Sequence, residues 1–292
     1  VMAVSDSPAI YELWSGMNGR MSALILSSIV LKNATAIESQ IMEATDAALK
    51  VSLLDELATR VIMPYIVMAV VLAALALMIR RSALPEIDVT AEEPSDANAP
   101  GLNLAVGRTS IWQFPHLLLG ALALFFYVGA EVMAGDVIGI YGKSLGFSLD
   151  LTKYFTTFTL AAMLLGYVLS IVAIPKYISQ QNFLKYSAIL GVVLTVLVYF
   201  TTGSTAVTFI ALLGLANAVM WPAIFPLAIN GLGKFTQIGS ALLVMGIAGG
   251  AVLPQIYGLI EKSLGYQAAF LISMLPCYLF IFYYAVKGYK PR

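Results

Sequence analysis

The stretch 114–141, FPHLLLGALALFFYVGAEVMAGDVIGIY, constrains this chain most, because it is long enough to cross a bilayer and yet carries two acidic residues. A carboxylate near the bilayer centre costs about 2.5–3.5 kcal/mol on insertion scales, so it usually faces a bundle interior or a wet cavity. Glu131 and Asp136 lie five residues apart, roughly 140° around a helix, and cannot face the same point. Glu131 shares a face with Tyr127, which makes it the better candidate for a cavity. For both acids, the alternative is a structural pairing with a neighbouring helix.

The composition is that of an integral membrane protein. Hydrophobic residues make up 60% of the 292 residues and charged residues only 11%, against about 45–50% and about 25% in soluble domains. The 16 basic and 16 acidic residues balance. The sequence contains no basic patch of the kind that binds nucleic acid, so we expect no nucleic-acid partner. The only cysteine is Cys277 and the only histidine is His116, so we expect no disulfide and no metal site, and we interpret His116 as an interfacial residue.

Hydropathy predicts an all-α membrane protein with six to seven spans. We expect them near 61–79, 114–141, 154–174, 183–201, 205–229, 237–259 and 266–286. The connections among the last six are short, which predicts a compact bundle in which neighbours in sequence pack antiparallel.

The rest of the chain predicts a division into five regions. Residues 1–31 contain a partial or disturbed helix, because the apolar run 21–31 is too short to span a bilayer and the chain starts with Val1. An amphipathic segment outside the membrane follows at 32–60 and a span at 61–80. The polar stretch 81–113 is a linker, and 114–292 is the six-helix bundle.

The distribution of basic residues predicts the orientation of the spans, because cytoplasmic loops carry an excess of lysine and arginine. The richer side holds Arg80, Arg81, Arg108, Lys176, Lys185, Lys234, Lys287, Lys290 and Arg292. The linker and the C-terminus are therefore expected in the cytoplasm, and 32–60 outside.

The span at 205–229 carries a second cluster of polar and helix-breaking residues. Asn217 and Trp221 are four residues apart and are expected to share a helix face. Pro222 and Pro226 each remove a backbone donor and should kink the helix, with neighbours or water satisfying the freed carbonyls. An amide beside an indole suits a hydroxylated ligand. The alternative is an asparagine that joins two helices and a tryptophan in an interfacial belt.

The span at 237–259 is rich in small residues, namely Gly239, Ser240, Gly246, Gly249 and Gly250. They indicate either tight helix packing or a helix that bends during a transport cycle. Gln255 follows Pro254 and is a weaker candidate for ligand contact. No P-loop, nucleophile elbow or zinc motif is present in the sequence, so we do not expect an enzyme.

Several segments resemble a known family, the fucose/galactose/glucose–proton symporters of the major facilitator superfamily, and more narrowly its glucose/galactose branch. They are MPYIVMAVVLAALALMIRRSALPEI at 63–87, FPHLLLGALALFFYVGAEVMAGD at 114–136, LANAVMWPAIFPLAINGLG at 215–233 and GSALLVMGIAGGAVLPQIYG at 239–258. The resemblance runs from about residue 17 to 292. It implies the six-helix C-terminal half of a transporter, with remnants of the N-terminal half before it.

That resemblance implies a proton-coupled monosaccharide importer of the bacterial inner membrane, working by alternating access. The coupling ion would be a proton and no cofactor is expected. As given, the chain would lack most of the N-terminal half, and we expect no transport by it alone. Candidate substrate-binding residues are Tyr127, Glu131, Asp136, Asn217, Trp221 and Gln255. The alternatives are a permease of the same fold for another solute, such as an amino acid or a drug, and a truncated membrane protein that transports nothing.

Overall fold

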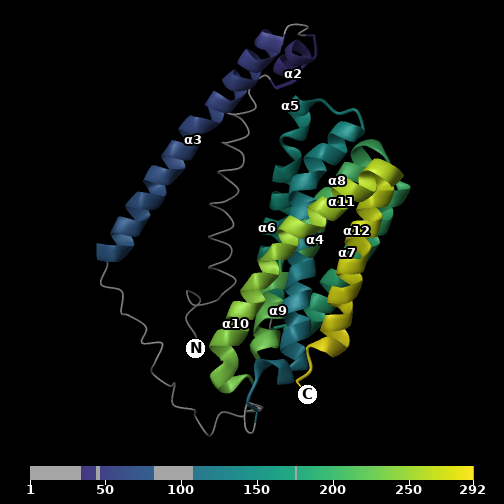
Figure 1. The fold of residues 1–292 in the computed structure, drawn as a ribbon. Helices are drawn as coiled ribbons and strands as arrows, with labels where there is room; N and C mark the ends of the chain where they lie inside the picture. The colour runs from purple at the N-terminus through teal and green to yellow at the C-terminus, as the bar shows by residue number, and fades with distance from the viewer. Residues whose placement is uncertain (1–33, 44–46, 82–107, 175, 292) are drawn as a thin grey trace. The chain divides into compact units, whose positions relative to one another are not determined.

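The computed structural model describes residues 34–43, 47–81, 108–174 and 176–291, and all the regular structure in these ranges is helical (Figure 1). Within them, seven helices are long and apolar enough to cross a membrane. The predicted all-α membrane fold is therefore confirmed. The predicted partial helix at 1–31 and most of the linker at 81–113 lie outside the described residues.

The chain divides into two compact units, and the first in chain order contains α2 (Ala34–Glu43) and α3 (Ala47–Arg81). α3 continues without a break through Pro64 and ends on two arginines. The boundary that we drew between an amphipathic segment at 32–60 and a span at 61–80 thus falls inside one helix. The hydropathic part of α3, Leu49–Met78, is long enough to span a bilayer.

The second unit is the bundle formed by the C-terminal part of the chain. Its elements are η2 (Ile111–Gln113), α4 (Pro115–Ser144), α5 (Leu149–Thr152), α6 (Phe155–Ala173), α7 (Gln180–Phe200), α8 (Gly203–Asn217), α9 (Met220–Ile229), η3 (Gly233–Phe235), α10 (Thr236–Val244), η4 (Met245–Ala248), α11 (Gly249–Leu264), α12 (Tyr266–Tyr283) and the π-helical turn η5 (Tyr284–Gly288).

α4 is the central helix of the bundle and packs against α6, α8, α9, α11 and α12 (Figure 1). It begins with Pro115, which suits a first helical position because the missing N–H would be unsatisfied there. Near this end, His116 is fully buried, and its Nε2 lies 2.9 Å from the carbonyl oxygen of Asn230. This contact joins the start of α4 to the segment after α9. Among the described residues, no group of three His, Cys, Asp or Glu side chains is placed to hold a metal.

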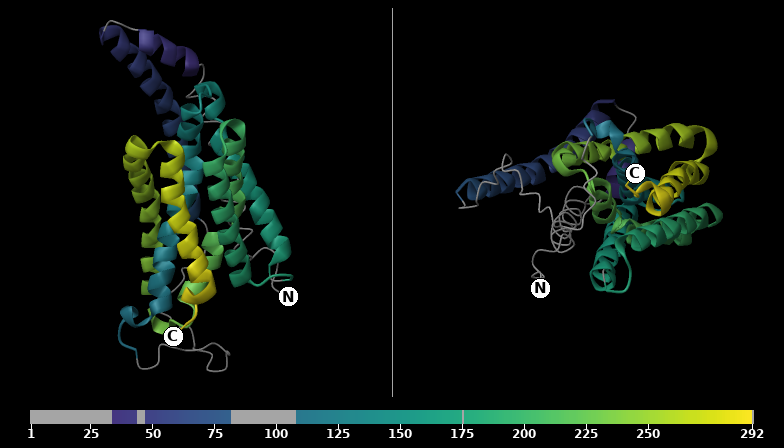
Figure 2. Two further views of the ribbon diagram at one scale, coloured as in Figure 1. Left: turned by 90° about the vertical axis from the view of Figure 1, so that its right-hand side faces the viewer. Right: turned by 90° about the horizontal axis from the view of Figure 1, so that it is seen from below.

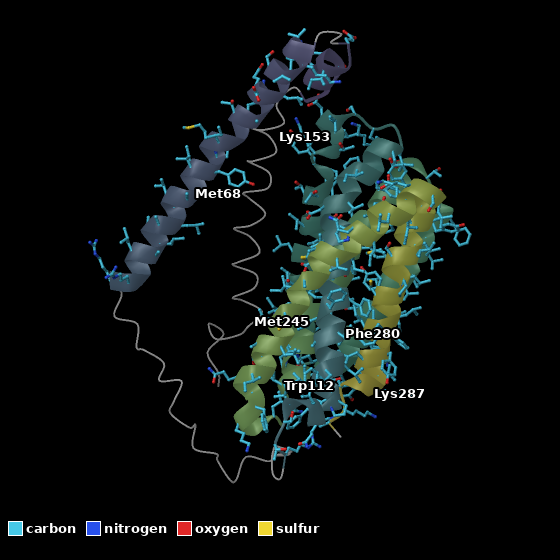
Figure 3. The ribbon with its side chains drawn as sticks, viewed as in Figure 1. Met68, Trp112, Lys153, Met245, Phe280 and Lys287 are labelled. Atoms are coloured by element: carbon cyan, nitrogen blue, oxygen red, sulfur yellow. The ribbon has the colours of Figure 1, made fainter. Side chains whose placement is uncertain are left out.

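Neighbours in sequence pack together only in part. α7 packs on α8 and α11 on α12, as short connections predict, but the main partner of α6 is α8, and α7 also packs extensively on α12. The side view in Figure 2 shows the bundle helices running along a common direction. Figure 3 shows Trp112 and Lys287 at one end of the bundle and Lys153 at the other. The beginning and the end of the bundle thus lie at the same end, as an even number of spans requires.

The glycine-rich span contains both a break and a close contact. The 3₁₀ turn η4 interrupts the helix between α10 and α11. Directly after it, α11 starts at Gly249, where a Cβ would lie only 1.8 Å from the carbonyl oxygen of Phe125 on α4. Tight packing therefore accounts for this glycine, and directly before it the helix changes from α-helical to 3₁₀ geometry.

Candidate functional site

An aromatic pair joins α4 to α9 in the middle of the bundle. The ring centroids of Tyr127 and Trp221 are 6.4 Å apart with their planes inclined by 55°. Trp221 also stacks on Phe225 at 6.2 Å and 22°. Tyr127 is buried, whereas Trp221 retains partial exposure. The indole is thus packed on two sides and still accessible in part, as a stacking surface for a ligand must be.

The two acids of α4 occupy different environments. Glu131 lies one helical turn after Tyr127 and is half-buried. Asp136 is exposed at the surface of α4. Nearby, two threonines of α6 donate hydrogen bonds to backbone carbonyls of α4, from Thr156 to Gly135 at 2.7 Å and from Thr159 to Ala134 at 3.1 Å. Of the two acids, Glu131 is therefore the one that is partly enclosed by the bundle.

Asn217 is fully buried at the last residue of α8. Its Oδ1 accepts a hydrogen bond of 2.9 Å from the hydroxyl of Tyr278. No described residue accepts a hydrogen bond from its Nδ2 group. A buried donor left unpaired costs about 1–3 kcal/mol. The Nδ2 group is therefore a candidate donor to a water or ligand oxygen.

The helix carrying Asn217 and Trp221 breaks between them. α8 ends at Asn217 and α9 begins at Met220. The break coincides with Ala218, four residues before Pro222. Pro222 has no N–H to donate to the Ala218 carbonyl oxygen, and its ring collides with that carbonyl group. The predicted kink is therefore present. As a consequence, Asn217 contacts α12 while Trp221 contacts α4. The two residues therefore do not share one helix face, contrary to the sequence-based prediction.

A side chain replaces the backbone hydrogen bond that the second proline of this segment cannot make. Pro226 cannot donate to the carbonyl oxygen of Pro222, four residues earlier. The Nε2 group of Gln180, at the first residue of α7, donates to that oxygen instead. The expectation that neighbours satisfy the freed carbonyls is met at this position.

The structure thus brings some of the predicted residues together and leaves others apart. Tyr127 meets Trp221, and Tyr278 joins Asn217 to α12. Asp136 and Gln255 lie exposed on α4 and α11. No local pattern of residues points to Tyr278, which is one of several tyrosines in an apolar span. Its position depends on Gly191 of α7, where a Cβ would lie 2.4 Å from Cδ1 of the tyrosine ring.

Comparisons with known proteins identify relatives of this chain. No protein-family model matches it. It is 33% identical over 251 residues to a glucose/galactose transporter of Brucella abortus, covering 85% of this chain and 57% of that protein. A putative glucose/galactose transporter of Helicobacter pylori is 31% identical over 260 residues, covering 86% and 60%. An L-fucose-proton symporter of Haemophilus influenzae is 26% identical over 274 residues, covering 92% and 62%.

Solved structures agree on the fold. A variant of the Escherichia coli fucose:proton symporter FucP superimposes with a TM-score of 0.69 at 21% identity, covering 95% of this chain and 67% of that one. FucP in an outward conformation, described as a major facilitator superfamily transporter, gives a TM-score of 0.63 at 23% identity, covering 85% and 59%.

All these relatives are transporters, which confirms the prediction that the chain is not an enzyme. The chain spans only about three fifths of the length of the curated relatives it matches, between 57% and 62%. Over most of its length the chain is therefore similar in sequence to glucose/galactose transporters and fucose–proton symporters, and it shares the fold of FucP, a major facilitator superfamily transporter.

Proposed function

We propose that the chain forms the C-terminal half of a proton-coupled importer for a monosaccharide of the glucose/galactose type. The observation that carries this proposal is the meeting of a half-buried carboxylate, Glu131, with an aromatic pair, Tyr127 and Trp221, one helical turn away. The names of the relatives at 31–33% identity favour glucose or galactose as the substrate.

The chemistry of these groups suits a sugar. A pyranose presents several hydroxyls that donate and accept hydrogen bonds, and an apolar ring face that stacks on an aromatic plane. The Glu131 carboxylate accepts from hydroxyls, the Asn217 amide offers both a donor and an acceptor, and the exposed side of Trp221 supplies the stacking surface. An amino acid would need a partner for its ammonium and another for its carboxylate in the same place. A lipophilic drug would be served by an apolar cavity without the acid.

Proton coupling in this proposal follows from the cost of a carboxylate in an apolar bundle. A proton that neutralises a buried acid removes that cost, and it biases the equilibrium between conformations that bury the acid to different extents. Glu131 is the acid of the described bundle that best fits such a role. The coupling ion is then a proton, and the proposal requires neither a metal nor an organic cofactor.

Transport needs a second wall for the sugar site. We propose that this wall is a six-helix N-terminal half, that the sugar binds between the halves, and that rocking of the halves exposes it to either side of the bacterial cytoplasmic membrane in turn. The share of its relatives that the chain covers, 57–62%, supports this proposal. Residues 1–292 alone are then expected not to move sugar across a membrane.

Trp221 offers a direct test of binding. The other tryptophans are Trp14 and Trp112, so a Trp14→Phe, Trp112→Phe double variant in detergent reports on Trp221 alone. Glucose or galactose should change its fluorescence saturably, while amino acids should not. A saturable response to an amino acid or a lipophilic cation, but to no sugar, would show that the substrate is another solute and would contradict the proposal.

Uptake tests the division into halves. Proteoliposomes containing the chain alone should show background uptake of labelled glucose and galactose. Co-expression with the N-terminal half of a full-length glucose/galactose transporter should restore uptake that an imposed proton gradient accelerates. Uptake by the chain alone above background would refute the need for a second half.

A further inference from the structure

We propose that Tyr278 is a positioning residue that fixes the side-chain amide of Asn217, so that its Nδ2 group donates a hydrogen bond to one oxygen of a bound monosaccharide. This inference rests on the function proposed above and assigns to α12 a part in sugar recognition. The hydrogen bond from Tyr278 to Asn217, 2.9 Å long and fully buried, carries it.

The hydrogen bond determines which way the amide faces. A planar amide presents its oxygen and its nitrogen in diverging directions, and either can occupy either position after a half-turn of the terminal torsion. In the structure the Tyr278 hydroxyl donates to Oδ1 and only Nδ2 stays unpaired. After the half-turn Nδ2 would donate to the hydroxyl oxygen, and both Oδ1 and the hydroxyl hydrogen would lose their partners. The amide is therefore held with Nδ2 directed away from Tyr278, and no described residue accepts from it.

The ring that holds the hydroxyl is itself tightly placed. Tyr278 has no exposed surface, and its ring packs on the backbone of α7 at Gly191, where a Cβ would lie 2.4 Å from Cδ1, 2.5 Å from Cε1 and 2.7 Å from Cγ. The absence of a side chain at residue 191 therefore sets the height of the hydroxyl above α7. Such support from a neighbouring helix is what a hydrogen-bonding group needs in order to discriminate between ligands.

The amide of Asn217 lies directly before the break between α8 and α9. Asn217 is sealed in the conformation described, and the residues after it, Ala218 and Val219, belong to neither α8 nor α9. α9 begins at Met220 and places the partly exposed Trp221 over Tyr127. The proposal requires α9 to move about this break when sugar binds, so that Nδ2 becomes accessible beside Trp221 while the hydrogen bond between Asn217 and α12 persists.

The consequence for specificity is that Asn217 acts as a donor and not as an acceptor. A sugar oxygen that accepts from Nδ2 satisfies a group which otherwise stays unpaired, so an analogue without that oxygen is rejected. A fluorine at the same carbon accepts weakly and cannot donate. Its analogue is then tolerated better than the deoxy analogue.

The test uses the whole 292-residue chain purified in detergent, with dissociation constants measured by calorimetry. The ligands are glucose, galactose and their monodeoxy and monofluoro analogues at each ring position. In the unsubstituted chain, one deoxy analogue should bind roughly tenfold more weakly than its parent sugar, with the fluoro analogue in between. Tyr278→Phe should weaken the parent sugar by about the same factor and leave that deoxy analogue unchanged.

The matched control is Tyr284→Phe, which removes a buried hydroxyl with no described partner from the turn that follows the same helix. It should leave both sugars unaffected. Gly191→Ala provides a second route, because its Cβ displaces the Tyr278 ring while keeping the hydroxyl, and it should reproduce the Tyr278→Phe pattern. In an Asn217→Leu chain, Tyr278→Phe should have no additional effect on the ratio of parent to deoxy affinity.

A merely structural role for Tyr278 would weaken parent and deoxy sugars equally, and that result overturns the inference. So does a Tyr278→Phe chain that discriminates as well as Tyr284→Phe. If sugar binds neither to the unsubstituted chain nor to the chain co-purified with the N-terminal half of a full-length glucose/galactose transporter, the proposed function itself fails and this inference falls with it. If sugar binds but the Tyr278→Phe pattern is absent, only the role of Tyr278 is wrong.

Discussion

The side-chain amide of Gln180, at the start of α7, donates a hydrogen bond to the backbone oxygen of Pro222, which is the acceptor that Pro226 leaves without its helical donor. One side chain thus repairs the backbone of a helix that lies 42 residues away in sequence. Inside the bilayer no water is available to donate a hydrogen bond to an unpaired carbonyl oxygen. Because Gln180 donates to that oxygen, one short helix can contain two prolines.

We expect Gln180→Ala to destabilise the bundle by about 1–3 kcal/mol, because it strands a buried carbonyl oxygen. The measurement is thermal unfolding in detergent. Gln181→Ala, one residue further and on another side of α7, is the matched control and should be close to neutral. In a Pro226→Ala chain, the backbone N–H at 226 returns to Pro222, so the effect of Gln180→Ala should largely disappear. An undiminished effect there would mean that Gln180 stabilises the protein by some other contact.

The contact between α11 and α4 gives a second prediction about stability. Gly249→Ala places a Cβ 1.8 Å from the Phe125 carbonyl oxygen, and backbone atoms cannot yield as a flexible side chain can. We expect a loss of about 1–3 kcal/mol, typical of overpacking. Gly258→Ala in the same helix meets nothing within 4 Å and should be neutral or slightly stabilising, because alanine is the better helix former. Equal melting temperatures for the two variants would contradict the close approach.

Glu131 and Asp136 should respond differently to replacement. We expect Glu131→Ala to abolish sugar binding by the chain, since the half-buried carboxylate lies one helical turn from the Tyr127–Trp221 pair that the sugar is proposed to contact. Asp136→Ala should retain binding within about threefold, because the exposed Asp136 side chain extends from a different side of α4. Fluorescence titration of Trp221 with glucose and galactose measures both variants. Retained binding in Glu131→Ala would place that residue among structural acids.

The orientation in the membrane can be read with thiol labelling. Cys277 is buried, and a Cys277→Ser background removes it. Lys153→Cys and Lys287→Cys lie at opposite ends of the bundle (Figure 3), and the excess of basic residues predicts that the Lys287 end is cytoplasmic. In intact cells, a membrane-impermeant maleimide should label Lys153→Cys and not Lys287→Cys. Both should react after the membrane is permeabilised, and the reverse pattern in intact cells would invert the topology.

The sequence by itself determined that the chain is a helical membrane protein and approximately where the spans of the bundle lie, and it singled out the polar residues within them. It could do so because hydrocarbon admits only apolar segments with internally paired backbones, so hydropathy and length reveal each span, and an acid such as Glu131 stands out by its cost. The proline rule likewise predicted the kink near Pro222.

The tertiary structure decided which helices pair and which side chains meet. Hydrophobicity does not distinguish one apolar helix face from another, so association depends on shape and on close approach at small residues. At Gly214, for example, a Cβ would lie 2.0 Å from the Thr159 carbonyl oxygen, which brings α8 against α6 rather than next to α7 alone. The same kind of fit at Gly191 places Tyr278 beside Asn217. A contact between two helices 61 residues apart depends on the packed shape of the whole bundle, and no local pattern of residues encodes it.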